Sequence, residues 1–270
     1  MKIAVIIPAA GMSTRYNSTQ DADPLGMGRS KLDEDLGGKT VLQRTIELFN
    51  TRPEVHQLVV VGPHDPDAMS NFILRHADRI SLLGAELVVG GKDHRWESVH
   101  AAMQVVSPDA THVAIHDAAR PATPLDLIDR VFDAAARFDA VIPVVPVGDT
   151  IKRVSSETID DKSEADPLAA ILGAGEANPM HEVVGGIDRV DAVMVQTPQV
   201  FARSLIERAY QQEDLSSTDD AGLIERLGER VVTVMGDPRN MKLTHAGDLP
   251  VLRAVMNVRD DKSRASHKRF

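Results

Sequence analysis

Apolar residues in the first half of the chain form short uninterrupted runs. The runs are Ile3 to Ile7, Leu58 to Val61, Glu86 to Val89, His112 to Ile115 and Ala140 to Val145. Continuous apolar runs of this length are typical of parallel strands that are covered on both faces. We therefore predict a buried, mostly parallel sheet.

Stretches with helical spacing separate these runs. One apolar helix face follows Thr40 (Val41, Leu42, Ile46, Phe49), and another follows Arg95 (Trp96, Val99, Met103, Val106). Alternating strands and helices predict an α/β fold, a doubly wound Rossmann-like sheet. Ligands of such sheets bind beyond the carboxyl ends of the strands, so we expect a site in the loops after Ile7, Val89 and Ile115.

The alternation stops from about Pro146 to Val195. Ser155 to Ala165 is polar and charged, and glycines punctuate the residues that follow. So long an irregular connection is uncommon in a compact domain without a functional cause. We interpret it as an inserted β-arm within a single domain of residues 1–258, followed by a charged, disordered tail of residues 259–270.

Beyond this arm the α/β pattern resumes. We expect a helix from about Val200 to Gln211 and a second helix that is capped by Ser217 or Thr218 and ends at Gly228. A strand from Val231 to Met235 should follow.

Composition excludes several classes of protein. The 270 residues carry 30 Lys and Arg against 40 Asp and Glu, a net charge of -10, which disfavours binding to nucleic acid or to an anionic membrane. The chain has no cysteine, so disulfides and thiolate metal sites are excluded. Met1 to Gly11 is better explained as a first strand and turn than as a secretion signal, because Pro8 interrupts the apolar run. A cytoplasmic protein is expected.

The loop from Pro8 to Arg15 contains small residues that allow a nucleotide to approach the backbone closely. Arg15 and Lys31 supply cations that could neutralise a triphosphate. A lone Ala-Ala-Gly loop is more often an ordinary tight turn, so this loop alone does not establish a site.

Six further motifs occur in order along the chain. They are Gly90-Gly91 with Arg95 and Ser98, His116 to Pro121, Asp149 to Arg153, Gln196 to Gln199, Thr218 to Ala221, and Asn240 to Thr244. With the first loop, they make the chain resemble the 2-C-methyl-D-erythritol 4-phosphate cytidylyltransferase family, from Ile6 to Asp248. The resemblance implies a nucleotide-diphospho-sugar transferase fold and transfer of CMP from CTP to 2-C-methyl-D-erythritol 4-phosphate, a step of non-mevalonate isoprenoid synthesis.

The resemblance also implies roles for individual residues. Catalysis would use Arg15, Lys31 and Lys242, and CTP would contact Pro8, Ala9, Ala10, Gly11, Gly90, Gly91, Ser98 and Ala118. The acceptor would contact Arg120, Thr150, Arg189, Thr197 and Thr218. Asp117 would hold Mg²⁺ or another divalent cation, although an Asp after a strand is equally often a helix cap. We interpret His116 as a packing residue.

The chain departs from the family pattern at several positions. Ser13 replaces a loop glycine, and extra residues lie between Arg15 and Lys31. One residue is added between Gly90 and Ser98, which leaves open whether Lys92 or Asp93 contacts the nucleotide. The sequence before Arg189 is altered, so a solvated arm residue is nearly as good an explanation for it.

Two other functions stay open from the sequence. Related enzymes that act on ribitol 5-phosphate share the first loop and the Asp117 motif, and a non-catalytic nucleotide-binding module could keep the fold. A dinucleotide-dependent dehydrogenase is disfavoured because the first loop lacks G-x-G-x-x-G. The long arm predicts a homodimer, in which Arg189 would serve the neighbouring subunit.

Overall fold

The computed structural model describes residues 1–11, 13–17, 30–159 and 180–258. Its strands are β1 (Ile3–Pro8), β2 (Val55–Gly62), β3 (Glu86–Val89), β4 (His112–Ile115), β5 (Ala140–Pro146), β6 (Ile151–Ile159), β7 (Met180–Ile187), β8 (Val193–Val195), β9 (Gln199–Ala202) and β10 (Val232–Met235). Its helices are α1 (Thr14–Asn17), η1 (Lys31–Asp33), α2 (Val41–Glu47), α3 (Pro66–Leu82), α4 (Arg95–Met103), α5 (Leu125–Ala135), α7 (Arg203–Ala209), α8 (Ala221–Arg226) and α9 (Asp248–Val255). The expected tail, residues 259–270, lies outside the described residues.

The chain divides into two compact units. The first consists of Met1–Val145 and the chain from Val195 onward, and the second is Pro146–Met194. In the first unit the strands run in the order β10-β5-β9-β4-β1-β2-β3. The predicted doubly wound, mostly parallel sheet is confirmed: β1 is parallel to β2 and β4, β2 to β3, and β5 to β10.

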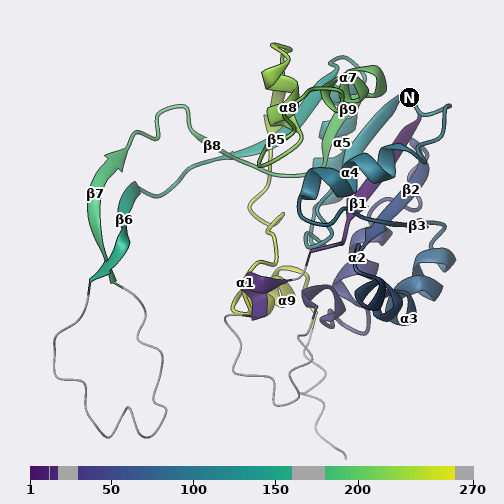
Figure 1. Cartoon of the computed structure of the whole chain (residues 1–270), viewed down its shortest axis with the longest axis horizontal. Helices are drawn as coiled ribbons and strands as arrows, with labels where there is room; N and C mark the ends of the chain where they lie inside the picture. Colours follow the sequence, from purple (N-terminus) through teal and green to yellow (C-terminus); the bar gives the residue numbers. More distant parts are fainter. Residues whose placement is uncertain (12, 18–29, 160–179, 259–270) are drawn as a thin grey trace, which may run out of the picture. The chain divides into compact units, whose positions relative to one another are not determined.

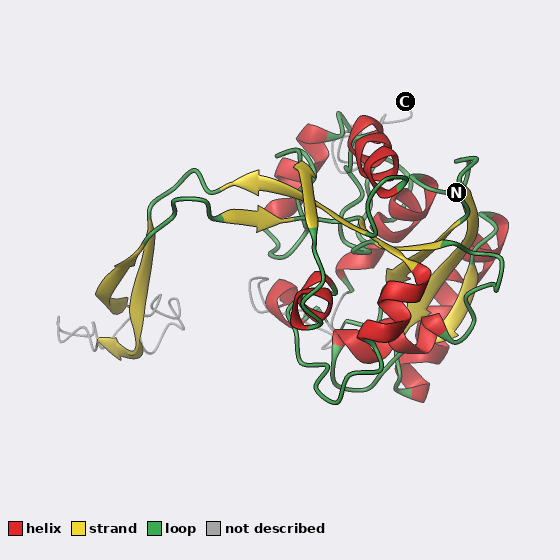
Figure 2. Ribbon diagram, turned by 90° about the horizontal axis from the view of Figure 1, so that it is seen from above, coloured by secondary structure: helices red, strands yellow, loops and turns green. Residues whose placement is uncertain are grey.

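Helices cover both faces of this sheet (Figures 1 and 2). Alternate residues of β1 take part in two separate cores. Ile3, Val5 and Ile7 pack with residues of α2, α3 and α5, whereas Ala4 and Ile6 pack with residues of α4, α7 and α8. Burial on both faces explains why the strands are apolar without alternation.

Two predictions for the C-terminal half were wrong in detail. Val200 to Ala202, predicted as the start of a helix, belong to β9, which is antiparallel to both β4 and β5. The helix begins only at Arg203 and ends at Ala209. The next helix, α8, has Asp220 at its N-cap rather than Ser217 or Thr218.

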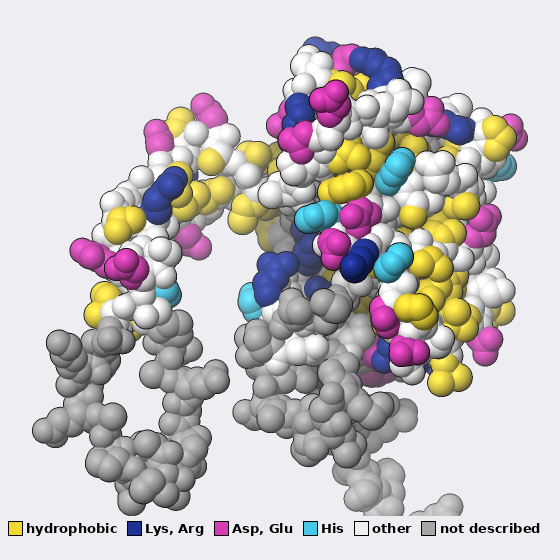
Figure 3. Space-filling model, in the orientation of Figure 1, with side chains coloured by type: hydrophobic (Ala, Val, Ile, Leu, Met, Phe, Trp, Pro, Cys, Tyr) yellow, Lys and Arg dark blue, Asp and Glu magenta, His cyan; other side chains and the backbone are white. Residues whose placement is uncertain are grey.

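The second unit contains an antiparallel strand pair, β6 and β7. Many of its apolar side chains are exposed, and Figure 3 shows hydrophobic side chains on its surface. They include Val154, Ile159, Met180, Val183 and Val184. The glycines at 173 and 175 lie outside the described residues. Within the described part of the chain, no helix is long and apolar enough to cross a membrane.

Candidate active site

A pocket opens at the carboxyl ends of β1, β3 and β4, where the sequence predicted it. Its volume of about 370 Å³ lies within the usual range of small-molecule sites. It is lined by residues 8–11, 13, 15, 16, 31, 32, 91–95, 98, 117–119, 242 and 244. Four segments therefore meet in one pocket: the first loop (Pro8 to Arg15), the loop that begins with Gly90 and Gly91 (the glycine loop), the Asp117 motif (His116 to Pro121) and the Lys242 motif (Asn240 to Thr244).

The first loop turns sharply at Ser13. Its φ of 56° lies in the left-handed region, which glycine adopts more readily than serine. The backbone thus keeps a glycine-like shape although the family glycine is replaced. The Ser13 hydroxyl in turn accepts a hydrogen bond from the backbone N–H of Lys31 at 3.4 Å.

The glycine loop lies against the start of α4. A side chain at Gly91 would meet Cβ of Glu97 at 1.9 Å, so the position requires glycine. The backbone N–H of Gly91 donates to Oγ of the buried Ser98 at 3.1 Å. The carboxylate of Glu97 accepts from the N–H groups of Asp93 and His94, and these hydrogen bonds lower the pKa of Glu97. Lys92 and Asp93 both line the pocket, so the choice between them stays open.

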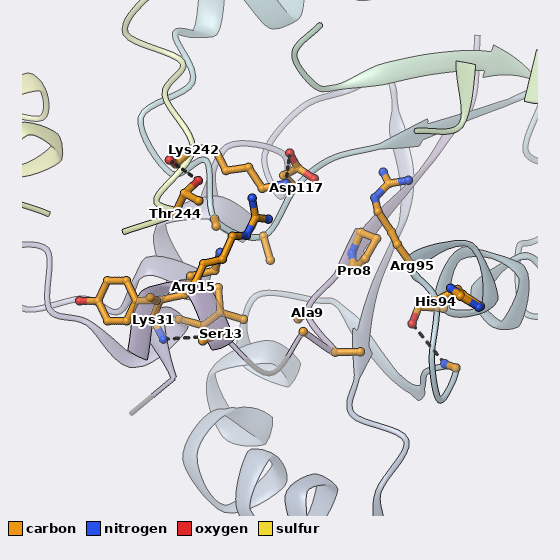
Figure 4. Close-up of a pocket in the computed structure, with 18 of the residues that line it drawn as sticks. Pro8, Ala9, Ser13, Arg15, Lys31, His94, Arg95, Asp117, Lys242 and Thr244 are labelled. Carbon is orange, nitrogen blue, oxygen red and sulfur yellow. Dashed lines mark hydrogen bonds and ion pairs between the residues drawn. The ribbon is translucent and has the colours of Figure 1, made fainter. Parts of the chain in front are cut away.

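Asp117 is the central carboxylate of the pocket. Its Oδ2 lies 3.1 Å from Nζ of Lys242 and 2.9 Å from Nε of Arg120 (Figure 4 shows the first contact). Burial raises the pKa of Asp117, but Lys242, Arg120 and Arg95 outweigh burial and hold it well below its usual range. The carboxylate therefore stays ionised at neutral pH.

Lys31 and Arg15 bring further positive charge to the same pocket. Nζ of Lys31 donates to the backbone oxygen of Leu243 at 2.8 Å, and the Arg15 side chain extends into the space below Asp117 in Figure 4. Burial lowers the pKa of Lys31 to about 8, and the charges of Lys242 and Arg15 contribute to this shift against the pull of Asp117. Such a concentration of cations is suited to a polyphosphate.

Behind the pocket, His116 and Thr197 orient Asp117. The Thr197 hydroxyl accepts from the backbone N–H of Asp117 at 3.0 Å and lies 3.1 Å from Nδ1 of His116. Nε2 of His116 faces the carbonyl of Arg120, so Nε2 carries the proton and Nδ1 accepts from Thr197. Burial lowers the pKa of His116 to about 4. His116 is fully buried, as its interpretation as a packing residue requires.

Several predicted site residues do not line this pocket. Gly90 is buried behind it, where an added side chain would meet the carbonyl oxygen of Gly62 at 2.6 Å. Arg120 points to Asp117 and to the backbone oxygen of Asn240, at 2.6 Å. Thr218 is exposed in the loop before α8. Thr150 and Arg189 belong to the second unit, where Arg189 donates to the carbonyl of Gly148.

Sequence reasoning gave no role to Arg95, which lines the pocket from the first turn of α4. Its guanidinium contacts the buried carboxylate of Asp220 at 2.5 Å, and Tyr210 donates to the same carboxylate at 2.6 Å. Burial lowers the pKa of Arg95, but the Asp220 charge and the other nearby groups together raise it more, so Arg95 stays charged. The appearance of Arg95 in a motif was the available signal, but Asp220 lies 125 residues away along the chain.

The carboxylate of Asp117 fits a divalent cation. Both of its ion pairs use Oδ2, and Oδ1 has no hydrogen bond within the described residues. The described residues contain no cluster of three or more His, Asp or Glu side chains suited to a metal. Mg²⁺ commonly binds through one or two carboxylates, with waters and substrate phosphates completing its shell. A single ionised Asp beside a polyphosphate pocket matches that pattern.

Known proteins identify the family. The family model of 2-C-methyl-D-erythritol 4-phosphate cytidylyltransferase matches residues 3–174 and 164–258. The chain is 38% identical to the 2-C-methyl-D-erythritol 4-phosphate cytidylyltransferase of Rhodococcus jostii (strain RHA1), over 94% of this chain and 95% of the relative. The chain belongs to this family. A relative of the same name from Solibacter usitatus is 33% identical over 98% of this chain and 99% of its own length.

A solved structure carries the same fold. The 2-C-methyl-D-erythritol 4-phosphate cytidylyltransferase from Thermus thermophilus matches with a TM-score of 0.66 and 27% identity, over 96% of this chain and 100% of that one. The resemblance drawn from seven separated motifs is thus confirmed at the level of family and fold. As a cytidylyltransferase of this family, the chain has its four cationic and acidic motif residues, Arg15, Lys31, Asp117 and Lys242, in one pocket.

Proposed function

We propose that this chain transfers CMP from CTP to 2-C-methyl-D-erythritol 4-phosphate, producing 4-diphosphocytidyl-2-C-methyl-D-erythritol and pyrophosphate. The observation that carries the proposal is the convergence of Arg15, Lys31 and Lys242 around the ionised Asp117 in a member of this family. A non-catalytic relative would have no need to keep this set of charges together.

The reaction is an in-line displacement at the α-phosphorus of CTP. An oxygen of the acceptor phosphate forms a bond to the α-phosphorus while the bridging oxygen to the β-phosphorus leaves with pyrophosphate. No protein nucleophile is needed, so the protein positions the reactants and stabilises negative charge. Lys242 would act on the α-phosphate and acceptor phosphate, whereas Arg15 and Lys31 would hold the triphosphate.

The nucleoside would lie along the first loop and the glycine loop. Pro8, Ala9, Ala10 and Gly11 offer a backbone surface without bulky side chains, and Ala118 lies beside Asp117. Gly91 and Ser98 bring a second backbone segment to the same pocket. Gly90 would contribute by fixing this loop rather than by direct contact.

Asp117 would hold Mg²⁺, which supplies charge neutralisation on CTP phosphate oxygens when bound. Arg120 and Thr197 hold Asp117 from two sides, by its carboxylate and by its backbone N–H. These contacts support a role near the transferred group. Direct contact of Arg120, Thr150, Arg189, Thr197 and Thr218 with the acceptor stays a prediction.

The enzyme is proposed to be a homodimer formed through the second unit. A two-stranded sheet with exposed valines is marginal alone and exposes strand edges that favour pairing with another chain. A second copy of this chain would bury these side chains. The cysteine-free sequence and the requirement for CTP fit a cytoplasmic enzyme.

The acceptor is tested by pyrophosphate release with CTP and Mg²⁺ under saturating concentrations of either acceptor. We expect turnover with 2-C-methyl-D-erythritol 4-phosphate and a rate at least about tenfold lower with ribitol 5-phosphate, because discrimination of polar groups in a built site is strong. Turnover of ribitol 5-phosphate alone would keep the chemistry and change the acceptor. No pyrophosphate release with either acceptor would favour a non-catalytic nucleotide-binding module.

A further inference from the structure

Asp33 connects the segment that carries Lys31 to the long helix α3. Its Oδ1 lies 2.7 Å from Nε2 of His76, and its Oδ2 lies 2.8 Å from a guanidinium nitrogen of Arg75. Oδ1 and Nε2 are both buried, and neither has a hydrogen-bonding partner within the described residues, because their 2.7 Å contact lacks the geometry of a hydrogen bond. This close contact is therefore the only interaction in the described residues that offsets the lost hydration of either atom.

The helix end of this contact is firmly anchored. The His76 side chain is only 2% exposed and packs against Phe72, with 4.7 Å between ring centroids. The helix spans Pro66–Leu82, and Asp65 caps its first turn by accepting from the N–H of Ala68. A capped helix that packs on the sheet is a rigid reference point for the short segment beside it.

The other end of the contact leads directly to the pocket. Asp33 is the last residue of η1 and Lys31 is the first, so both lie in one helical turn. Leu32 between them is buried in the core, and Nζ of Lys31 reaches the pocket next to Leu243. If the backbone of Lys31 shifted, its long side chain could still enter the pocket, but Nζ would no longer be held at the same position relative to the triphosphate.

We propose that Asp33, His76 and Arg75 form a clamp that positions Lys31 for binding the triphosphate of CTP. The proposal rests on the proposed function, and it concerns positioning residues that act through Lys31. The alternative is a purely structural contact that stabilises the fold and does not affect the position of Lys31. The two explanations differ in whether loss of the clamp still matters once Lys31 is gone.

The clamp is tested by a double-mutant cycle with Asp33→Ala, Lys31→Ala and the combined variant. CTP affinity is measured by calorimetry without acceptor, and kcat and KM for CTP are measured by pyrophosphate release. Asp33→Ala should weaken CTP binding about tenfold, and it should change affinity less than about twofold in the Lys31→Ala background, because the two residues act as a unit. Equal effects in both backgrounds would overturn the clamp.

Two variants of His76 separate positioning from folding. His76→Gln keeps a polar N–H group close to the position of Nε2 and should retain near-normal CTP affinity. His76→Phe keeps an aromatic ring but loses the nitrogen that faces Asp33, and should resemble Asp33→Ala. Asp129→Asn is the control, because it removes the ion pair between Arg52 and the 59% exposed side chain of Asp129, and neither residue lies in η1 or α3. If Asp33→Ala fails to fold, the His76 pair decides alone: equal affinities of His76→Gln and His76→Phe overturn the clamp.

The calorimetric readout also separates this proposal from the proposed function. Wild-type protein that binds CTP but turns over neither acceptor would contradict the proposed reaction while leaving the clamp measurable. Wild-type turnover with an additive double-mutant cycle would contradict the clamp alone.

Discussion

Asp117 shows how single side chains combine into the site. Its carboxylate forms ion pairs with Lys242 and Arg120, and its backbone N–H donates a hydrogen bond to the Thr197 hydroxyl. The sequence could name Asp117, Arg15, Lys31 and Lys242 because each lies in a local motif. Arg95 escaped assignment because its orientation depends on its ion pair with Asp220, which no local pattern links to it.

Lys242→Ala should lower kcat by roughly 100- to 1,000-fold, the usual effect of removing one group that stabilises transition-state charge. Nζ of Lys242 lies 3.1 Å from Asp117, at the side of the pocket where the α-phosphate is proposed. Arg239→Ala, three positions earlier and paired with Asp237 on the surface, is the control and should keep its rate. A near-normal rate for Lys242→Ala with an intact fold would remove Lys242 from the mechanism.

The pKa of Lys31 predicts a pH dependence. Burial and two neighbouring cations lower this pKa to about 8, so Lys31 is charged below pH 8 and loses its charge above it. The value of kcat/KM for CTP should therefore fall as the pH rises through about 8, whereas a terminal phosphate group titrates around pH 6, about two units lower. Lys31→Arg keeps the charge at all these pH values and should move the fall to higher pH. An identical fall in both proteins would assign it to another group.

At the scale of elements, hydrophobic pattern predicted the parallel strands closely, and β3 and β4 begin and end at the predicted residues. Strand β9 was missed because Val200 and Phe201 continue directly into the apolar face of α7, with Leu205 and Ile206. Only pairing with β4 and β5 distinguishes the two, and those partners are distant in sequence. The N-cap of α8 was misplaced for a related reason, since Asp220 is fixed there by Arg95 and Tyr210.

Asp220 links three helices, because Arg95 begins α4, Tyr210 is the C-cap of α7 and Asp220 is the N-cap of α8. Asp220→Ala should lower the free energy of unfolding by about 2–4 kcal/mol, somewhat less than for a fully enclosed pair because the Arg95 side chain is 29% exposed. Tyr210→Phe removes one hydrogen bond and should lower it by about 1 kcal/mol. Urea denaturation measures both. If both variants lost the same small amount of unfolding free energy, the contact between Arg95 and Asp220 would contribute little to stability.

At the scale of the whole molecule, the sequence located the segment that became the second unit. It could not determine the pairing of β6 with β7, because the polar residues around Ser155 obscure a strand pattern. The exposed valines of this unit are the main reason to expect a second copy of the chain.

Val183→Glu should therefore convert a dimer to a monomer in sedimentation, because a buried charge at the contact is costly. The Val183 side chain is 58% exposed in the single chain. Leu74→Glu is the control: Leu74 is 85% exposed on α3 in the first unit, and its replacement should leave the dimer intact. A wild-type monomer at working concentration would contradict the proposed assembly.

The central claim is transfer of CMP from CTP to 2-C-methyl-D-erythritol 4-phosphate by the pocket around Asp117. Phosphorus NMR of the purified protein with CTP, this acceptor and Mg²⁺ tests it most directly, because it identifies the bond that forms. We predict a pyrophosphate signal together with the paired signals of a new diphosphate ester, both absent without acceptor. Intact CTP, or CTP hydrolysed while the acceptor signal stays unchanged, would contradict the claim.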